Sequence, residues 1–259
     1  MIRRLLYILV LMTPVSAVAQ SFEDALNLYT EGNFYAAADM AEALETVDGD
    51  ALAARALLAE AAYQAEGADA DAALARALDI SERAVAANPS HFEALLQRVI
   101  ALGYKSRQMG SWPAHNAGLG HETRDLIERA IAADPNQAWG WVVKGGWTAE
   151  VLDGGGLVAR MIYGVSRKAV DESYERAIAL DPHNPILHIE YARALLRLSI
   201  RRHMADAAQL LERAHALTAR DALERLIKQQ GETLRTALKS GDRKRIKQVF
   251  RATDPFAKQ

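Results

Sequence analysis

The chain has 259 residues, half of them hydrophobic, and its 31 lysines and arginines nearly balance its 33 aspartates and glutamates. The resulting formal net charge of −2 excludes a global basic field that would attract nucleic acid. The absence of cysteine excludes disulfides, thiol catalysis and a lipid-modified cysteine, and the richness in alanine and leucine favours an all-α fold.

The first nineteen residues have the three parts of a secretory signal peptide. Arg3 and Arg4 supply the positive start, Leu5 to Met12 form a short apolar run, and Ala17-Val18-Ala19 is a small-x-small cleavage pattern. An uncleaved anchor is the alternative, although the apolar run is too short to span a bilayer. We therefore expect a signal peptide over 1–19 and a mature chain that is periplasmic or secreted, without stable membrane insertion. A bacterial periplasm fits best, because extracellular eukaryotic domains more often contain disulfides.

From residue 20 onward the apolar pattern predicts helices separated by short breaks. A first hairpin spans Ser21–Glu45 and is broken at Gly32-Asn33. Further helices are expected at Leu52–Glu66, Ala70–Ala87, Phe92–Met109, Thr123–Ala133, Ala138–Leu152, Leu157–Tyr163, Lys168–Leu180, Ile186–Leu198, Ala205–Leu217, Asp221–Leu238 and Arg243–Arg251. Gly110–Gly120 is expected to form a loop.

Three of these helices end in the same pattern. A-V-A-A-N-P ends at Pro89, A-I-A-A-D-P at Pro135 and A-I-A-L-D-P at Pro182, and each is preceded by Glu-Arg. Proline ends a helix because it lacks the backbone N–H and restricts the residue before it. The prolines are 46 and 47 residues apart, and such a period indicates repeats that stack to bury their apolar faces.

Hairpins that close in A-x4-P resemble the tetratricopeptide repeat (TPR). In the best-matching unit, Trp141 and Gly145 fall at the tryptophan and glycine positions, Tyr174 at the aromatic position, and Ala177 and Pro182 at the end. The period is longer than the usual TPR period of about 34 residues, so HEAT repeats are an alternative. We expect an all-α, TPR-like helical-hairpin solenoid of about five helix pairs over 20–220, followed by C-terminal capping helices over 221–259.

The same unit is also similar to the repeat domain of the regulator-of-microtubule-dynamics proteins and to bacterial periplasmic relatives. This resemblance rests on Gly145-Gly146-Trp147 and on Ala159–Tyr163. It implies a helical adaptor and no enzyme.

The sequence contains no pattern typical of a catalytic or metal site. There is no H-E-x-x-H and no G-x-S-x-G, and the glycines at 154–156 are not followed by Gly-Lys-Ser/Thr. His115 and His121 share a loop with Glu122 and can approach a metal there, but a solvated loop is the simpler interpretation. We expect no enzymatic activity, no cofactor and no metal.

A candidate binding groove follows from the TPR resemblance, which implies that the first helix of each pair lines the concave face. The repeat register places these residues there: Leu96, Ile100, Tyr104, Trp139, Val142, Ile189, Arg193 and Arg197, with Phe22, Leu26, Tyr29 and Leu196 as further members. The same register assigns Trp141 to the core. The mainly apolar set fits an apolar helix, an extended segment or a lipidic ligand. Alternatively, the insertions at 103–120 and 151–168 fold inward and fill the groove with Leu157, Val158, Met161 and Ile162.

The last predicted helix carries five basic residues beside Ile246, Val249 and Phe250. A capping helix with a solvated basic face is the preferred interpretation, and a helix lying on an anionic membrane is the alternative. Together these patterns predict an exported, non-catalytic TPR scaffold that binds another protein or a peptide segment, with no nucleic-acid partner. The alternative function is a periplasmic carrier of a small ligand or lipid, associated with a transporter and using the apolar groove.

Overall fold

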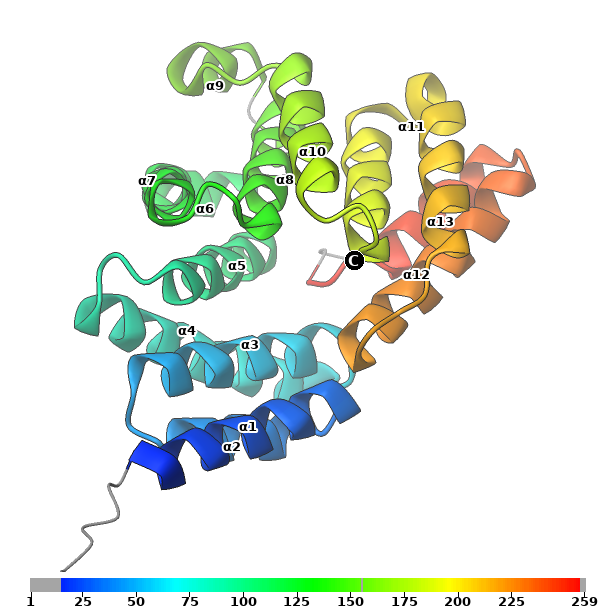
Figure 1. Ribbon diagram of the computed structural model, residues 1–259. Coiled ribbons are helices and arrows are strands. Elements are labelled where there is room, and N and C mark those ends of the chain that lie inside the picture. The colour runs from blue at the N-terminus through cyan, green and yellow to red at the C-terminus, as the bar shows by residue number, and fades with distance from the viewer. Residues whose placement is uncertain (1–14, 155, 257–259) are drawn as a thin grey trace, which may run out of the picture.

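The computed structural model describes residues 15–154 and 156–256, and all regular secondary structure within these ranges is helical (Figure 1). The helices are α1 (Val15–Glu31), α2 (Phe34–Glu42), α3 (Val47–Tyr63), α4 (Gly67–Ala87), α5 (Phe92–Met109), α6 (Ser111–Asn116), α7 (Leu119–Ala133), α8 (Ala138–Gly154), α9 (Gly156–Tyr163), α10 (Arg167–Leu180), α11 (Pro185–Ala216), α12 (Ala222–Lys239) and α13 (Arg243–Ala252). Most of the predicted signal peptide lies outside the described residues.

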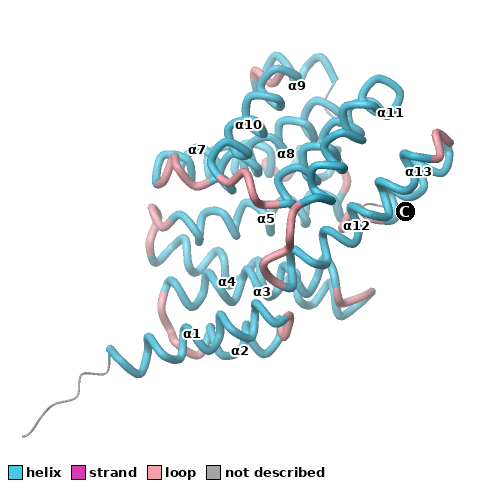
Figure 2. Tube along the Cα trace, turned by 45° about the vertical axis from the view of Figure 1, so that its right-hand side comes forward, coloured by secondary structure: helices cyan, strands magenta, loops and turns pink. Residues whose placement is uncertain are grey.

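The helices form antiparallel hairpins that stack into a curved array (Figures 1 and 2). The pairs are α1 with α2, α3 with α4, α5 with α7 and α8 with α10, and the fifth pair is formed by the two halves of α11. The predicted all-α solenoid of about five helix pairs is thus confirmed.

The repeated Asn/Asp-Pro endings act through the side chain before the proline. Asn88 and Asp134 leave the helical conformation at the ends of α4 and α7. Asn88 Oδ1 then accepts the backbone N–H of Ser90 at 3.1 Å, and Asp134 Oδ1 accepts that of Asn136 at 3.0 Å. These Asx turns satisfy the backbone where the helical hydrogen bonds stop, so each pattern ends one helix and aims the chain at the next.

One helix, α6, was not predicted from the sequence, and the connection within the fifth pair is shorter than predicted. Part of the predicted loop 110–120 is the short helix α6, whose Ala114 is buried in the core between α5 and α7. The two helices of the predicted fifth pair are the two halves of α11, which meet at a kink at Ser199, where φ is −172° and ψ is 107°. A single residue in extended geometry replaces the expected connection and separates the two halves of α11.

The insertion at 151–168 does not fill the concave face with its described side chains, so the alternative that it folds inward is wrong for Met161 and Ile162. Met161 and Ile162 of α9 are 86% and 50% exposed. Tyr163 anchors α9 on α7 and α8, because its ring contacts Trp147 and His121 with centroid distances of 5.5 and 4.8 Å. The side chains of Leu157 and Val158 lie outside the described residues.

The terminal helices contact both ends of the array. Helix α12 packs on α11 and α13, and its first turn also reaches α1 and α3. Ala222 Cβ lies 3.0 Å from the position that a Cβ on Gly32 would occupy, and Arg225 Nη2 donates to the Thr30 carbonyl at 3.4 Å. The last part of the chain therefore contacts the first hairpin as well as the last one (Figure 1).

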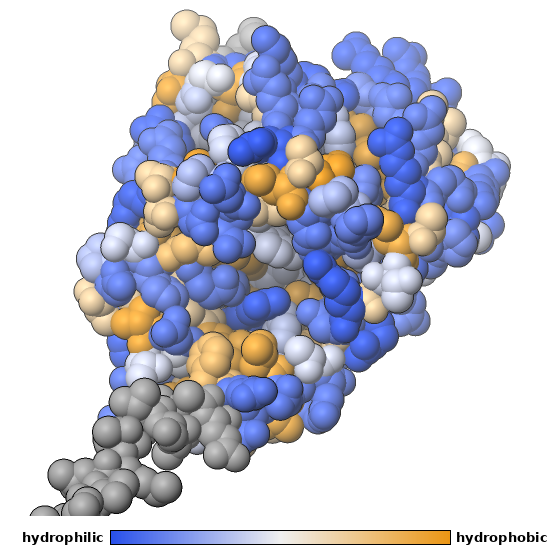
Figure 3. Space-filling view, viewed as in Figure 1, coloured by the Kyte–Doolittle hydropathy of each residue, from blue (hydrophilic) through white to orange (hydrophobic). Residues whose placement is uncertain are grey.

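Helix α13 places its apolar side against the protein. Ile246 is fully buried in the core shared by α11 and α12, and Val249 and Phe250 pack partly buried against the same core. The basic side chains of α13 face outward. On the face shown in Figure 3, polar side chains likewise separate the smaller apolar areas.

Candidate functional site

A cavity of about 220 Å³ lies on the concave side of the array. Its wall is formed mainly by the first helices of successive pairs, α3, α5, α8 and α11, and by residues from α12, α13 and the segment after α13. The wall is largely apolar, with charged groups from α3, α5, α8 and α11 among the leucines, isoleucines and aromatics. The cavity thus combines an apolar lining with a few fixed ionic groups, which is typical of binding sites.

The structure brings together most of the residues that the repeat register assigns to the groove. Seven candidates contribute to the cavity wall: Leu96, Ile100, Tyr104, Trp139, Val142, Arg193 and Arg197. Trp139 is partly buried between the cores built on α8 and α11. The expectation of a fully core Trp141 needs correction, because its ring is partly exposed and its Nε1 donates to the Pro135 carbonyl at 3.0 Å.

Ile189 does not line the cavity, and its assignment to the groove is wrong. It is fully buried in the core between α11 and α12. Its Cδ1 lies 2.9 Å from the position that a Cβ on Gly231 of α12 would occupy. Leu196 belongs to the same core. The residues of α11 that face the cavity are Ile186, Glu190, Arg193, Ala194 and Arg197, one helical stripe rotated away from Ile189.

The first hairpin also lies outside the cavity wall. Phe22 and Leu26 pack against the core formed by α1 to α4, and Tyr29 is fully buried in that core, with its ring 5.3 Å from the ring of Phe34. Arg55 covers the Tyr29 ring with a guanidinium-to-centroid distance of 4.5 Å. Arg55 itself lines the cavity, so Tyr29 packs against a residue of the cavity wall without lining the cavity itself.

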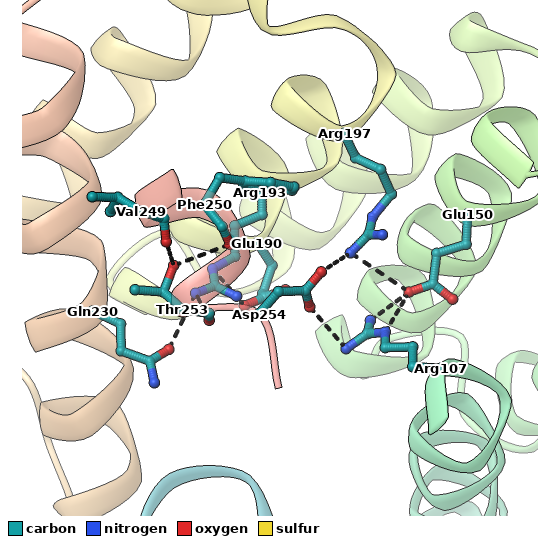
Figure 4. A network of polar contacts seen from close by, with 10 residues as sticks. All are labelled: Arg107, Glu150, Glu190, Arg193, Arg197, Gln230, Val249, Phe250, Thr253 and Asp254. Carbon is teal, nitrogen blue, oxygen red and sulfur yellow. Dashed lines mark hydrogen bonds and ion pairs between the residues drawn. The ribbon is translucent and has the colours of Figure 1, made fainter. Parts of the chain in front are cut away.

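Two arginines and two carboxylates form a network across the cavity (Figure 4). Arg107 of α5 donates from Nε to Glu150 Oε1 of α8 at 2.8 Å, and its Nη1 lies 3.4 Å from Asp254 Oδ1. Arg197 of α11 donates from Nη2 to Asp254 Oδ2 at 2.6 Å and lies 4.0 Å from Glu150 Oε1. The carboxylate of Asp254, which comes from the segment after α13, thus joins α5 to α11, and Glu150 connects α8 to the same two arginines.

The segment Thr253–Phe256, called the C-terminal tail below, lies against the cavity through three kinds of contact. Arg193 donates to the Thr253 carbonyl and, at 3.1 Å, to Gln230 Oε1. Asp254 binds the arginine pair described above, and the Phe256 ring lies 5.1 Å from the Tyr104 ring, tilted by 37°. Arg107, Glu150 and the tail were not among the site residues predicted from the sequence. The one sequence feature that could have indicated the tail is the run Asp-Pro-Phe directly after an amphipathic helix.

Burial and ion pairing act in opposite directions on these groups. Burial alone would raise the pKa of Asp254, but Arg107, Arg197 and Arg193 outweigh it and leave that pKa below its ordinary value. Burial alone would lower the pKa of Arg107, but Glu150 and Asp254 reverse the effect and raise it. Burial raises the pKa of Tyr104, so its phenol is protonated and neutral at neutral pH. Asp254 and Arg107 are therefore both charged at neutral pH.

The ionised arginines can bind an anion, and the apolar wall can accept side chains or an apolar ligand. Among the described residues, no group of histidine, aspartate and glutamate side chains is arranged to hold a metal ion. His121 packs against Tyr163, and the side chain of His115 lies outside the described residues. In the part of the chain that the structure describes, no helix is both long and apolar enough to span a bilayer.

Comparisons with known proteins bear on the fold. The sequence matches no protein-family model, and no curated protein is significantly similar to it. Among solved structures, the chain is similar to a thermophilic TPR protein of Thermus thermophilus, with a TM-score of 0.58 and 16% sequence identity. The match covers 83% of this chain and 98% of that one. By fold, this chain is a TPR-like repeat protein.

Proposed function

We propose that this chain is an exported, non-catalytic TPR-like scaffold that binds a segment of another protein in its concave cavity. The observation that carries the proposal is the composition of the wall. The inner helices of successive hairpins together present apolar side chains and the arginines Arg107, Arg193 and Arg197 on one surface. An extended or helical segment meets such a surface with alternating apolar and charged side chains.

A photo-crosslinking amino acid in place of Ile100 tests this proposal, because Ile100 lines the cavity and is only partly buried. In cells of the native host, this probe should form a crosslinked product with a distinct second protein, identified by mass spectrometry. The control probe replaces Glu172, whose side chain is 62% exposed on α10. Capture of the same protein by the Glu172 probe, with none at Ile100, would move the binding surface to the outside and contradict the proposal.

Export is supported by the pattern of Arg3, Arg4, the apolar run and Ala17-Val18-Ala19. N-terminal sequencing of the protein from the cell envelope should begin at Gln20. An intact Met1 terminus on the envelope protein would rule out cleavage.

A second candidate function is the carrying of a small apolar ligand. It is favoured by the volume of about 220 Å³ that stays open beside the tail and by wall residues such as Leu58, Val99 and Ile227. Native mass spectrometry of the purified full-length chain should then show a bound mass that organic extraction removes. If protein purified from its native host never carries such a bound mass, the carrier function is contradicted and the scaffold function remains.

A further inference from the structure

The C-terminal tail lies along the cavity wall and makes contacts there that a peptide ligand could also make. Its two anchors are spaced two residues apart: the Asp254 carboxylate between two arginines, and the Phe256 ring on Tyr104. The side chain of Asp254 is only 7% exposed, and Pro255 contributes to the cavity wall. A short turn segment with a carboxylate and, two residues later, an aromatic ring is thus already accommodated at this wall.

The ionic balance of the cavity depends on this segment. Arg107 and Arg197 share two carboxylates, Glu150 and Asp254. If the tail leaves, Glu150 remains as the one described carboxylate in contact with both guanidiniums. An excess positive charge on a partly buried wall attracts another carboxylate, because charge-assisted hydrogen bonds to arginine are strong and geometrically specific.

The tail is also held under strain. Phe256 has φ of +59°, in the left-handed region that bulky side chains rarely adopt. Such a conformation persists only where surrounding contacts hold it, and here the contact is the Tyr104 ring. A competing segment that places its aromatic ring on Tyr104 without this strain has no such free-energy cost. It can therefore replace the tail at these contacts.

We propose that the C-terminal tail is a displaceable ligand of its own cavity, and that the partner displaces it with a short segment carrying a carboxylate and, two residues later, an aromatic ring. This inference rests on the proposed scaffold function and specifies both the partner's chemistry and its regulation. A tethered tail competes at a high effective concentration, so it excludes weak ligands and admits those that bind both anchors better.

The test uses a fluorescent peptide with the sequence of residues 251–259, followed by anisotropy. The receptors are the full-length chain and a full-length variant with Asp254→Ala and Phe256→Ala. Because the variant lacks both tail anchors, it should bind the peptide on the order of tenfold or more tighter than the unaltered chain. Peptides in which the aspartate is replaced by asparagine, or the phenylalanine by alanine, should bind the variant more weakly. Adding Arg107→Ala and Arg197→Ala to the variant should remove the preference for the aspartate, because these two arginines bind the Asp254 carboxylate.

A second receptor, the chain ending at Thr253, retains α13 and guards against misfolding of the double variant. If both receptors are folded by circular dichroism and neither binds the peptide better than the unaltered chain, the proposal is overturned. Concentration-dependent dimers that Asp254→Ala abolishes would assign the tail to the cavity of a second copy, and would also overturn it.

The crosslinking experiment distinguishes failure of this inference from failure of the scaffold function. If the Ile100 probe captures a partner but neither opened receptor binds the peptide, the scaffold stands and the tail is a fixed structural element. If the peptide binds but the Ile100 probe captures no protein in a chain with the opened tail, the scaffold function fails instead.

Discussion

Two neighbouring glycines of α8 face different surroundings. A Cβ added to Gly145 would lie 2.6 and 2.8 Å from ring atoms of Tyr174, whereas the nearest atom for Gly146 is the Tyr174 hydroxyl at 3.5 Å. The Tyr174 ring cannot easily move, because it is buried and stacks on Tyr191 with a centroid distance of 4.9 Å and an interplanar angle of 9°. Gly145 thus permits the close crossing of α8 and α10, while Gly146 borders the cavity.

Alanine at these two positions should separate packing from helix propensity. Both substitutions gain roughly 1 kcal/mol of helix propensity, but Gly145→Ala also overpacks the crossing at a cost of about 1–3 kcal/mol. Gly146→Ala should therefore be neutral or stabilising, and the two variants should differ by about that packing cost. Urea unfolding of both variants measures the difference. Equal stabilities would show that the crossing tolerates a methyl group.

Two isoleucines show where the repeat register holds and where it fails. Ile189 is fully buried against α12, whereas Ile100 borders the open cavity and is partly buried. Ile189→Ala should lower the free energy of unfolding by about 2–5 kcal/mol, and Ile100→Ala by clearly less. Chemical denaturation of the two variants side by side checks this order. A larger loss for Ile100→Ala would contradict the placement of the cavity.

Acid should release the tail. Burial raises the pKa of Asp254, but Arg107, Arg197 and Arg193 lower it by more. The pKa in the folded chain is therefore below the unfolded value of about 3.9. Its stabilising contribution is therefore complete above the unfolded pKa and is lost as the pH falls through the folded pKa. The difference in unfolding free energy between the unaltered chain and Asp254→Asn should be constant from pH 7 to about 5 and shrink below about pH 4. A difference in unfolding free energy that grows as the pH falls would contradict this prediction.

Part of the site follows from sequence at this scale, and part does not. Spacing along one helix is a local property, so the register places Leu96, Ile100 and Tyr104 together on α5. It fails at Ile189 because α12, a late element, covers that side of α11. The binding of Asp254 to Arg107 joins residues far apart in the chain, and no local pattern encodes such a contact.

At the scale of the element, helix ends are the most predictable feature. Phe92–Met109 is α5 with the bounds that the sequence suggested, because His91 caps its start and Gly110 leaves it with a positive φ of 84°. Helix α6 is less predictable, since six residues containing a proline carry too little periodicity. The kink between the two halves of α11 is confined to Ser199, and composition does not reveal such a single-residue break.

Helix α5 also offers a way to block the cavity without weakening the fold. Gly103 lines the cavity, and a Cβ added there would meet no atom within 4 Å. Gly103→Leu should therefore occupy part of the cavity and gain helix propensity, so thermal stability should hold or rise while binding of the 251–259 peptide to the opened variant weakens. Gly103→Ala is the matched control, with the same propensity gain and little volume. Unimpaired peptide binding by Gly103→Leu would place the ligand elsewhere.

At the scale of the whole molecule, α12 joins the two ends of the array. Open solenoids are approximately sums of nearest-neighbour interactions, so their ends can unfold separately. Here Ala222 contacts the first hairpin and Gly231 receives Ile189 of the last pair, so one helix contributes to both ends. We therefore expect the described array to unfold as one cooperative unit.

Ala222→Leu tests this coupling, because Ala222 is buried close to Gly32 and a larger side chain there should push the two segments apart. The variant should unfold in two steps in urea, with probes on α2 and on α11 no longer coincident. Ala205→Leu, at an exposed position of α11, is the control and should retain a single transition. Coincident transitions in Ala222→Leu would mean that the contact contributes little to cooperativity.

The contact between α12 and the first hairpin also sets an order of events during synthesis. A chain leaves the ribosome from its N-terminus, and domains fold as their segments emerge. The surface of the first hairpin that receives Ala222 stays uncovered until nearly the whole chain has been made, because its cover lies almost 200 residues downstream of Thr30. The nascent protein therefore presents an unfinished apolar edge for most of its translation, and completion of the fold waits for one of its last helices.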